Sequence, residues 1–426
     1  MDNDAYYYYL LLALFPLVYL MRIYRGSLTS RNGGLRLPPG PWQLPIIGSL
    51  HHLLGALPHR ALRDLSRRHG PLMLLRFGEV PAIVASTAEA SKEITKTYDH
   101  IFCTRPLSAS AKVLSERSKG IAFAPYGGEW RQLRKICILE LLGARNITSF
   151  RPIHEEEVNR LIRSIVDDSS EVVTTHRRRS SEEAQAHQEQ DIIDVLLRIQ
   201  RDGNLQFPLT MDNLKVVIFD LFAAGSEAPA TILQWAMAEL MRRPSTMSRA
   251  QAEVRGAFMG QTKVTEEGLG ELSYLHCIIK ETLRLHPPGP FLLPKQCQEQ
   301  CKILGYDVPK GTTVLLNAWA ISRDPEYWDE PDAFVPDRFL ASATDYKGNC
   351  FEFIPFGAGR RICPGMLFGV AIAELALASL LFHFDWTLPD GTSPADLDMT
   401  ETMGITARKK EDLQLRATLH LQPAET

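Results

Sequence analysis

A glycine-rich loop with a single cysteine, at residues 351–365, constrains this chain more than any other stretch. It reads FEFIPFGAGRRICPG and leads directly into an apolar run, Met366 to Phe384, that predicts a buried helix. Cys363 would therefore lie at the start of that helix, where backbone N–H groups and the helix dipole stabilise negative charge. Arg360 and Arg361 add fixed positive charge beside the sulfur. This setting favours a thiolate, the form of cysteine that binds a metal ion.

The cysteine belongs to a longer pattern, FxxGxRxCxG. The alternative for any single cysteine is a small buried hydrophobic residue. A chance match to the whole pattern somewhere in the chain has a probability on the order of 10⁻⁴. The glycines do not form a dinucleotide-binding fingerprint, because Ile362 stands where the third glycine would be. The matching residues are Phe356, Gly359, Arg361, Cys363 and Gly365.

Composition excludes some classes of protein. The 426 residues, 45 % hydrophobic and 23 % charged, suffice for one large or two ordinary domains. A net charge of −3 gives no basic field, so no nucleic acid is expected as a partner. Seven cysteines, an odd number, indicate reduced thiols and a cytosolic body. Cys297 and Cys301 are four residues apart, but no second Cys or His pair follows them, which argues against zinc.

The N-terminal segment, residues 1–25, predicts a transmembrane anchor. Residues 5–21 are apolar or aromatic, two aspartates precede them, and four arginines follow between residues 22 and 36. Because cations stay on the cytosolic side, the rest of the chain is expected in the cytosol. A cleavable signal peptide is the alternative, but the start is acidic and no Ala-x-Ala cleavage site follows. Residues 26–48, basic and proline-rich, are expected to form a stiff hinge, and residues 49–426 the folded domain.

The folded domain is expected to be mainly helical with small β-sheets. An amphipathic helix near residues 58–70 precedes two β-branched runs, Leu72 to Phe77 and Ala82 to Ala85, that predict a hairpin. A later helix, opening at Glu129, places Trp130 and Arg134 on one face, where an indole N–H and a guanidinium can bind the same anion. The alternative for this helix is an ordinary charged surface. Further strands are expected at Phe291 to Lys295 and Gly305 to Leu316, and a closing hairpin region at Gly391 to Gln422.

The longest helix is expected at residues 211–241, with Thr210 as its N-cap. Small residues at 223–225 would let a flat ligand lie against it, and Glu227 is the only acid beside them. Pro229 lacks an N–H and its ring crowds the carbonyl of Gly225, so we expect a kink there.

Two further motifs precede the cysteine loop. Glu281 and Arg284 lie three residues apart on an expected helix, residues 275–286, and PDRF at 336–339 follows. An ExxR pair taken alone is more often a solvent-exposed ion pair.

The order of ExxR, PxRF and cysteine loop resembles the core of the cytochrome P-450 family, the haem-thiolate monooxygenases, and the proline-rich segment resembles the hinge of plant microsomal members. The resemblance implies that fold, haem b as cofactor, and Cys363 as the axial ligand of the iron. It also implies a buried charge triad of Glu281, Arg284 and Arg338. The residues that it assigns to cofactor binding are Trp130, Arg134, Lys295, Phe356, Gly359, Arg361 and Gly365.

The chain departs from the family at two places. Gly225 and Glu227 match the catalytic motif of the central helix, but Ala228 stands where a threonine usually manages proton delivery to dioxygen. Thr231, three residues further on, is a poor substitute unless the kink re-aims it. After a helix at 152–166, the polar stretch 167–190 leads to a short helix at 191–200, where typical members carry several more helices. We therefore expect an internally shortened chain whose pocket lacks part of its roof.

The resemblance implies a monooxygenase that oxidises a small hydrophobic, terpenoid-like or other specialised-metabolism substrate with dioxygen and NADPH-derived electrons. The implied partners are NADPH-cytochrome P-450 reductase, which would dock at Arg131, Lys135 and Arg360, and cytochrome b5. The implied location is the endoplasmic reticulum membrane. The turn at residues 403–405 is expected to lie near the substrate. Two alternatives stay open. A haem-thiolate isomerase or dehydratase, working without external dioxygen, would tolerate Ala228. A poorly active or non-catalytic product of a shortened gene would explain both departures.

Overall fold

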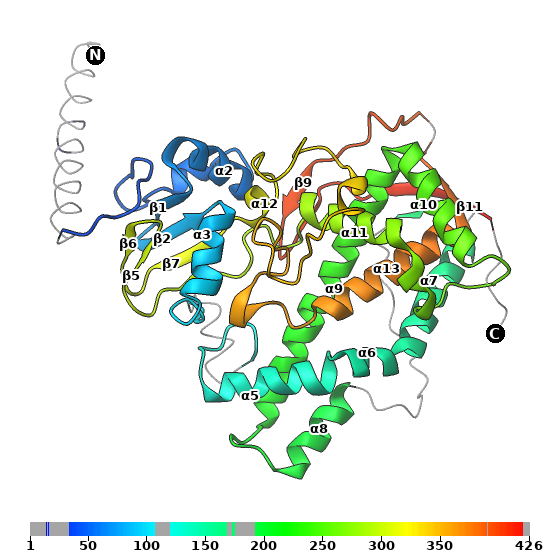
Figure 1. Cartoon of the computed structure of the whole chain (residues 1–426), viewed down its shortest axis with the longest axis horizontal. Helices are drawn as coiled ribbons and strands as arrows, with labels where there is room; N and C mark the ends of the chain where they lie inside the picture. The colour runs from blue at the N-terminus through cyan, green and yellow to red at the C-terminus, as the bar shows by residue number, and fades with distance from the viewer. Residues whose placement is uncertain are drawn as a thin grey trace, which may run out of the picture.

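The computed structural model describes residues 34–106, 120–167, 173–174, 192–389 and 391–420, together with Leu14 and Pro16. The expected anchor at residues 5–21 and most of the polar stretch 167–190 therefore lie outside the described residues. Figure 1 shows a sheet-rich part on the left and a helical part on the right, with the long helix α9 running diagonally between them.

The sheet-rich part is built on four strands in the order β1-β2-β7-β4. The predicted hairpin is confirmed as β1 (Leu72–Phe77) and β2 (Val80–Ala85), joined through Gly78 at φ +61°. Side chains alternate across the pleat, so the two faces of this hairpin have separate cores. Met73, Leu75 and Val84 pack with Leu62 of α2 (Pro58–His69), and Leu72, Ile83 and Ala85 with α3 (Ala88–Lys92) and η2 (Glu93–Thr97).

The strands expected in the middle of the chain are shorter than predicted. From Phe291 to Lys295 only the last residue is in a strand, β4 (Lys295–Gln296), because Leu292 has φ +54° and Pro294 has no N–H to donate. The expected strand from Gly305 to Leu316 is two strands, β6 (Tyr306–Val308) and β7 (Thr313–Leu316), separated by a turn at Gly311. β6 pairs with β5 (Cys301–Ile303).

Part of the expected hinge is fixed to this sheet. The Leu74 N–H donates to the carbonyl of Pro39 at 2.9 Å, and the Asp307 N–H donates to the carbonyl of Arg36 at 2.7 Å. A Cβ at Gly40 would lie 2.0 Å from the Leu74 carbonyl oxygen, so only glycine fits there. Residues 36–40 are thus held against the sheet by hydrogen bonds.

The helical part is organised around α9 (Met211–Met241), which has the predicted limits. Thr210 Oγ1 accepts from the Asn213 N–H at 3.1 Å and Asn213 Oδ1 accepts from the Thr210 N–H at 3.1 Å, a complete capping box. The helix continues through Pro229 without a break in its assignment. The helices of this part that pack with α9 or with one another are α7 (Arg151–Asp167), α10 (Pro244–Ala257), α11 (Ser273–Leu285) and α13 (Met366–His383).

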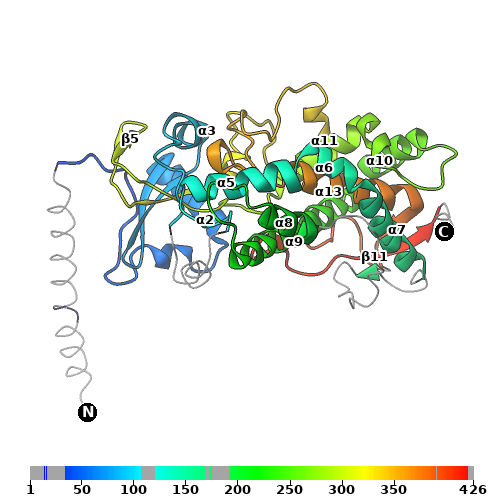
Figure 2. The same cartoon turned by 90° about the horizontal axis from the view of Figure 1, so that it is seen from below.

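The first half of α9 shares a hydrophobic cluster with α5, η3 and α8. α5 (Gly128–Ile136) continues into η3 (Cys137–Leu141), and α6 (Ala144–Ser149) follows and leads to α7. α8 (Ile192–Asp202) packs against α9 through Val195 and Leu196, and Figure 2 shows the two helices side by side. Short helical turns complete the connections: η1 (Leu50–Leu53), η4 (Glu267–Glu271), α12 (Ala318–Ile321), η5 (Pro336–Phe339) and η6 (Gly359–Arg361).

The C-terminal region is more than a single hairpin. β9 (Glu401–Met403) and β10 (Ala407–Lys409) form a hairpin whose turn, residues 404–406, reaches α9. β11 (Gln414–Leu419) instead pairs with β8 (Phe384–Thr387) and with β3 (Val173–Thr174). The expectation of one closing hairpin was therefore incomplete, since β8 directly follows α13 and needs a partner.

Candidate active site

The cysteine loop is a tight backbone structure that ends at the start of α13. The Cys363 N–H donates to the carbonyl of Phe356 at 2.9 Å, and the Ile362 N–H donates to the carbonyl of Gly359 at 3.0 Å. Gly359 has φ +72°, and a Cβ there would lie 2.3 Å from the carbonyl oxygen of Thr95. Gly365 is the N-cap of α13. These contacts therefore fix the backbone that carries the Cys363 sulfur at the start of α13.

Burial raises the pKa of the Cys363 thiol above its usual range. The Gly365 N–H lowers this pKa, as predicted for backbone donors at the helix start, and so does the guanidinium of Arg134 rather than those of Arg360 and Arg361; together they do not outweigh the loss of solvent. The prediction that the loop by itself favours a thiolate is therefore wrong for the chain alone. A metal ion bound to the sulfur would displace the proton, because coordination stabilises the thiolate directly.

Four cationic side chains gather on the same side of the molecule. Arg105, Arg361 and Lys295 are buried and Arg134 is half-buried. Within the described ranges none of the four forms an ion pair with a carboxylate. The guanidinium groups of the three arginines donate to main-chain carbonyls instead. These bonds are Arg105 to Leu293 at 2.5 Å and Pro294 at 2.9 Å, Arg134 to Ile362 at 2.6 Å, and Arg361 to Cys103 at 2.7 Å and Ala124 at 2.5 Å.

Lys295 shows that this group of four cations lacks an anionic partner within the described residues. This residue is 4 % exposed, and its Nζ has no hydrogen-bond partner in the part of the chain that the structure describes. Burial, together with the positive charges of Arg105 and Arg361, lowers the pKa of Lys295 to about 7. Burial and the neighbouring arginines likewise lower the pKa of Arg105 to about 9. Since buried charge is stable only when paired, the group fits a ligand that carries carboxylates.

Trp130 lies beside two of these arginines. Its indole Nε1 donates to the carbonyl of Ile121 at 3.0 Å in this structure, and its predicted bond to an anion stays a prediction. The indole ring lies 4.0 Å from the guanidinium of Arg361 and 5.4 Å from that of Arg134. Trp130 thus holds the two arginines in place by cation–π contact.

The middle of α9 offers an open strip. Ala224 and Gly225 are exposed, and a Cβ placed on Gly225 would meet no atom within 4 Å. Glu227 beside them accepts a hydrogen bond from Thr406 at 2.9 Å, and Ala228 is half-buried. A flat group can approach the helix here, as the small residues predicted.

The described residues contain no cluster of three or more His, Cys, Asp or Glu that could hold a bare metal ion. A metal at Cys363 must therefore bring its other ligands with it. An iron porphyrin does so, and its two propionates match the cations around Lys295. The residues present fit haem.

The predicted triad of Glu281, Arg284 and Arg338 is brought together at the end of α11. The Arg284 guanidinium donates to both oxygens of Glu281 at 2.7 and 2.8 Å, and Arg338 Nε donates to Glu281 at 3.1 Å. The side chains of Glu281 and Arg284 are fully buried. Glu281 also accepts from the Val335 N–H at 2.8 Å, so the triad ties α11 to the segment that leads toward the cysteine loop.

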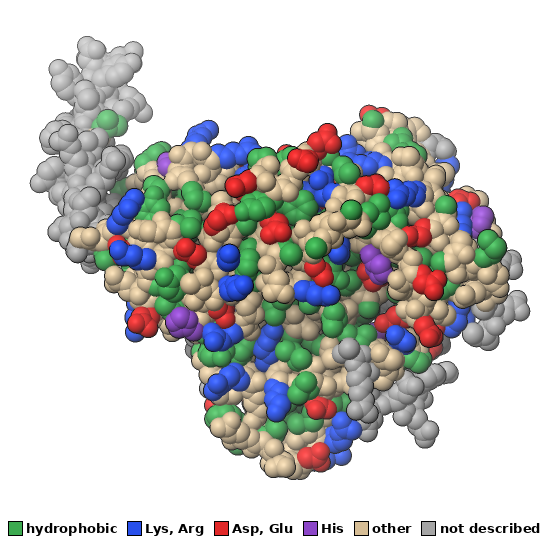
Figure 3. Space-filling view, in the orientation of Figure 1, with side chains coloured by type: hydrophobic (Ala, Val, Ile, Leu, Met, Phe, Trp, Pro, Cys, Tyr) green, Lys and Arg blue, Asp and Glu red, His purple; other side chains and the backbone are tan. Residues whose placement is uncertain are grey.

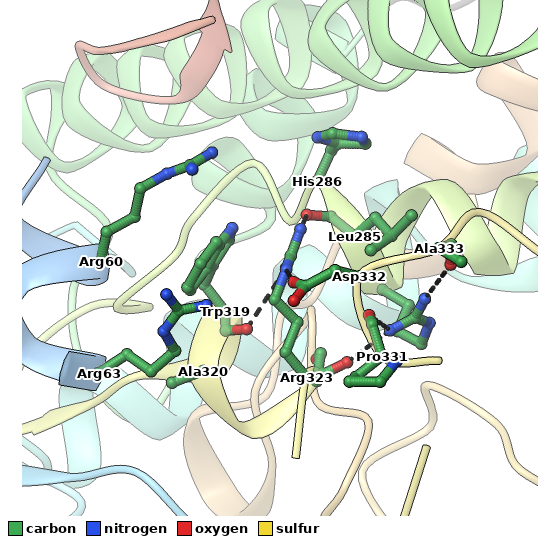
Figure 4. A network of polar contacts seen from close by, with 12 residues as sticks. Arg60, Arg63, Leu285, His286, Trp319, Ala320, Arg323, Pro331, Asp332 and Ala333 are labelled. Atoms are coloured by element: carbon green, nitrogen blue, oxygen red, sulfur yellow. Dashed lines mark hydrogen bonds and ion pairs between the residues drawn. The ribbon is translucent and has the colours of Figure 1, made fainter. Parts of the chain in front are cut away.

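A third arginine, Arg323, extends this network, as Figure 4 shows. Arg323 lies 4.0 Å over the ring of Trp319 and donates to the carbonyl of Leu285 and to Asp332. Arg60 and Arg63 flank the same ring at 5.2 and 4.9 Å. This network fixes residues 319–333 against α11.

Sequence reasoning missed three of these residues: Arg105, Arg323 and Thr406. None lies in a recognisable motif, and each acts on groups far away in the chain. The one local signal was that Arg105 precedes a proline in a loop.

A cysteine at a helix start, unpaired buried cations and an open strip on a central helix define a haem-thiolate protein. The family model described as cytochrome P450 matches residues 38–176 and 165–415, and the chain belongs to this family.

Comparison with known proteins gives the same result. Premnaspirodiene oxygenase of Hyoscyamus muticus is 41 % identical over 96 % of this chain and 98 % of its own length. 5-Epiaristolochene 1,3-dihydroxylase of Nicotiana tabacum is 40 % identical, with the same coverage. A zebrafish cytochrome P450 solved with abiraterone matches with a TM-score of 0.74 and 23 % identity, over 85 % of this chain and 99 % of that one, which shows the same fold. The chain is a haem-dependent monooxygenase of specialised metabolism.

The comparisons also bear on the expected shortening. The alignment with the Hyoscyamus enzyme spans 493 positions, more than the 426 residues of this chain, so that relative carries residues that this chain lacks. The two matched segments of the family model meet at residues 165–176, beside the polar stretch. Both findings support the prediction.

Proposed function

We propose that the protein oxidises a small apolar molecule of the terpenoid class, with Cys363 as the residue that would bind haem iron. Arg105, Arg134, Lys295 and Arg361 would hold the propionates. The supporting observation is Lys295, a buried amine that has no hydrogen-bond partner among the described residues and lies beside two buried guanidinium groups. The relatives named as a premnaspirodiene oxygenase and a dolabradiene monooxygenase support the terpenoid class.

Each residue of the site has a definite part in this mechanism. Haem, when bound, would supply the redox chemistry, and Cys363 would bind its iron as a thiolate. The cations orient the cofactor by binding its carboxylates, and Gly225 leaves room for its flat face. Glu227 places a carboxylate that can relay protons beside that face, while Ala228 offers no hydroxyl.

The substrate contacts are proposed at the turn before β10. Ile405 is 76 % exposed and Met403 is 38 % exposed, so both apolar side chains are accessible to a ligand. Apolar side chains in solvent are stabilised when an apolar molecule covers them.

The electron donor is an NADPH-cytochrome P-450 reductase, with cytochrome b5 as a second donor. Arg131 and Lys135 are exposed on α5, and Arg360 is exposed on the cysteine loop, where it pairs with Asp99 at 3.3 Å. Lys and Arg side chains gather over the lower part of the face in Figure 3, where Figure 1 places α5. Such a basic surface attracts an acidic partner and speeds association at low salt.

The proposed location is the endoplasmic reticulum membrane, with a single anchor at residues 5–21. Within the described part of the chain, α9 and α13 are long and apolar enough to cross a membrane. Both are helices of the folded body, and 61 % of the most apolar window of α13 is buried.

A reduced carbon monoxide difference spectrum of the membrane-expressed protein tests the haem site. We expect the red-shifted Soret band of a haem-thiolate centre in the wild type and in a Cys350→Ser control, and its loss in Cys363→Ser. Absence of the band in the wild type at normal expression would overturn the proposal and favour a non-catalytic product of a shortened gene.

Ala228 favours one second candidate, a haem-thiolate isomerase or dehydratase. Such an enzyme acts on an oxygenated substrate and needs no proton delivery to dioxygen. Turnover of a lipid hydroperoxide without NADPH, at a rate above that of Cys363→Ser, would support it. Turnover of a terpene hydrocarbon that requires NADPH would exclude it as the main activity.

A further inference from the structure

The second half of α9 is clasped by the C-terminal hairpin. Trp235 Nε1 donates to the carbonyl of Ala407 at 2.9 Å, and the Lys409 N–H donates to Gln234 Oε1 at 3.2 Å. One turn earlier, the hydroxyls of Thr231 and Thr406 lie 3.0 Å apart. Thr406 is thus held at a fixed place beside the helix.

Thr406 also reaches the acid of the central helix. Its Oγ1 donates to Glu227 Oε1 at 2.9 Å. A hydroxyl has one proton and an ionised carboxylate only accepts, so the proton of Thr406 is committed to Glu227. Thr231 must then donate to Thr406, which sets the direction of the whole chain of hydrogen bonds.

This series of hydrogen bonds is buried at the Thr231 end and accessible to water at the Glu227 end. Thr231 is 3 % exposed and Thr406 is 5 % exposed, whereas Glu227 is only half-buried. Glu227 and Thr231 lie four residues apart, on one face of α9, and Thr406 bridges them from another part of the fold. Water therefore competes for Glu227 but not for the two hydroxyls behind it.

We propose that Thr406, supported by Thr231, is the positioning residue for Glu227 and supplies from the C-terminal turn the hydroxyl that position 228 lacks. The inference rests on the proposed role of Glu227 in proton delivery. A hydroxyl at 228 would be adjacent to the acid along the helix. Here the hydroxyl bonds to the acid across the fold and fixes the orientation of its carboxylate.

Thr406→Val removes the hydroxyl at nearly constant volume, and Thr406→Ser restores it. The assay is reconstituted holoenzyme with reductase and NADPH, without substrate. Dioxygen then takes two electrons and two protons to give hydrogen peroxide, or four of each to give two waters. We expect Thr406→Val to raise the amount of peroxide formed per NADPH oxidised at least twofold. Thr406→Ser should return this ratio toward the wild-type value. In a Glu227→Gln background, Thr406→Val should not change the ratio further.

An infrared measurement on the resting protein reports on the same contact without turnover. The difference between wild type and Glu227→Gln isolates the carboxylate band of Glu227, and we expect this band to shift in Thr406→Val and to return in Thr406→Ser. The fluorescence of Trp235 serves as a control for an intact clasp and should not change in either variant.

The outcomes separate the two claims. If Glu227→Gln leaves the peroxide ratio unchanged, the proposed role of Glu227 fails and the inference fails with it. If Glu227→Gln raises the ratio but Thr406→Val does not, or the carboxylate band does not move, only the role of Thr406 is overturned. A changed Trp235 fluorescence with an unmoved band would show that Thr406 is structural, which also overturns the inference.

Discussion

The two halves of α9 differ in how the protein covers them. From Thr231 to Met241 every residue except Leu233 is buried, against α11, α13 and β10. In the first half Phe222 is 74 % exposed and Phe219 is 55 % exposed. One continuous helix therefore has a core half and an uncovered half.

The difference separates the packed core from the candidate cofactor surface along one helix. The buried half belongs to the packed core that holds the triad and the C-terminal hairpin, and its Thr231 is linked to Glu227 through Thr406. The exposed half carries the open strip at Ala224 and Gly225. Each Å² of apolar surface left in water there forgoes about 25 cal/mol.

The largest effect is expected at the triad behind the buried half. Glu281→Ala leaves Arg284 buried and unpaired, so we expect a loss of about 3–5 kcal/mol in the free energy of unfolding. Urea unfolding of the holoprotein measures it. Glu79→Ala is the control, because its side chain is 72 % exposed in an ion pair with Arg76. Equal losses in both variants would contradict the prediction.

Leu240→Ala tests packing in the buried half itself. Leu240 is fully buried in the core between α9 and its neighbours, so we expect a loss of about 2–5 kcal/mol from the cavity and the lost transfer free energy. The same urea experiment applies. A loss below about 1 kcal/mol would mean that this half is packed more loosely than the structure shows.

Acid should weaken the hairpin that clasps the buried half. Burial alone would raise the pKa of Glu401, but the hydrogen bond from His59 at 2.8 Å and the charges of His59 and Arg60 lower it to about 2. Because the folded-state pKa lies below the usual value of 4.5, this stabilisation is present above pH 4.5 and is lost as the pH falls toward 2.

Glu401→Gln isolates that contribution. We expect the difference in the free energy of unfolding between wild type and variant to be at most about 3 kcal/mol at pH 6 and to vanish near pH 2. Urea unfolding at a series of pH values across that range measures it. A difference that does not depend on pH would show that the contact acts through packing rather than charge.

The smallest effect is expected in the exposed half. Phe222→Ser should change the free energy of unfolding by no more than about 0.5 kcal/mol, since the ring is already in water, while it lowers aggregation without detergent. Light scattering and urea unfolding measure the two quantities. A loss above about 1 kcal/mol would show that another surface covers Phe222 in solution, which would break the comparison between the halves.

The sequence predicted the features that depend on neighbouring residues. The start of α9 follows from the Thr210 cap, and its apolar sequence continues past Pro229 to Met241. The hairpin of β1 and β2 follows from two apolar runs around Gly78. Glu281 and Arg284 meet because they are three residues apart on one helix.

The remaining features depend on contacts that are distant in the chain. Thr406 bonds to Glu227 across 179 positions, and Arg105 bonds to Leu293 across 188. The pKa of Cys363 was misjudged for a related reason, because local donors are visible in a sequence and the surrounding burial is not. The short strands near Lys295 depend on the backbone angle of Leu292, which no propensity predicts.

The contact of Gly359 with residues 95–99 has a consequence for protein engineering. The backbone of the cysteine loop lies so close to the Thr95 carbonyl that no side chain fits between them, and the Arg360 N–H donates to Asp99 at 3.1 Å. The loop and this earlier turn are therefore one unit made of two distant pieces of chain. A chimaera that exchanges residues 351–365 with another member should also exchange residues 93–99, since a transplanted loop alone would meet a surface shaped for a different partner.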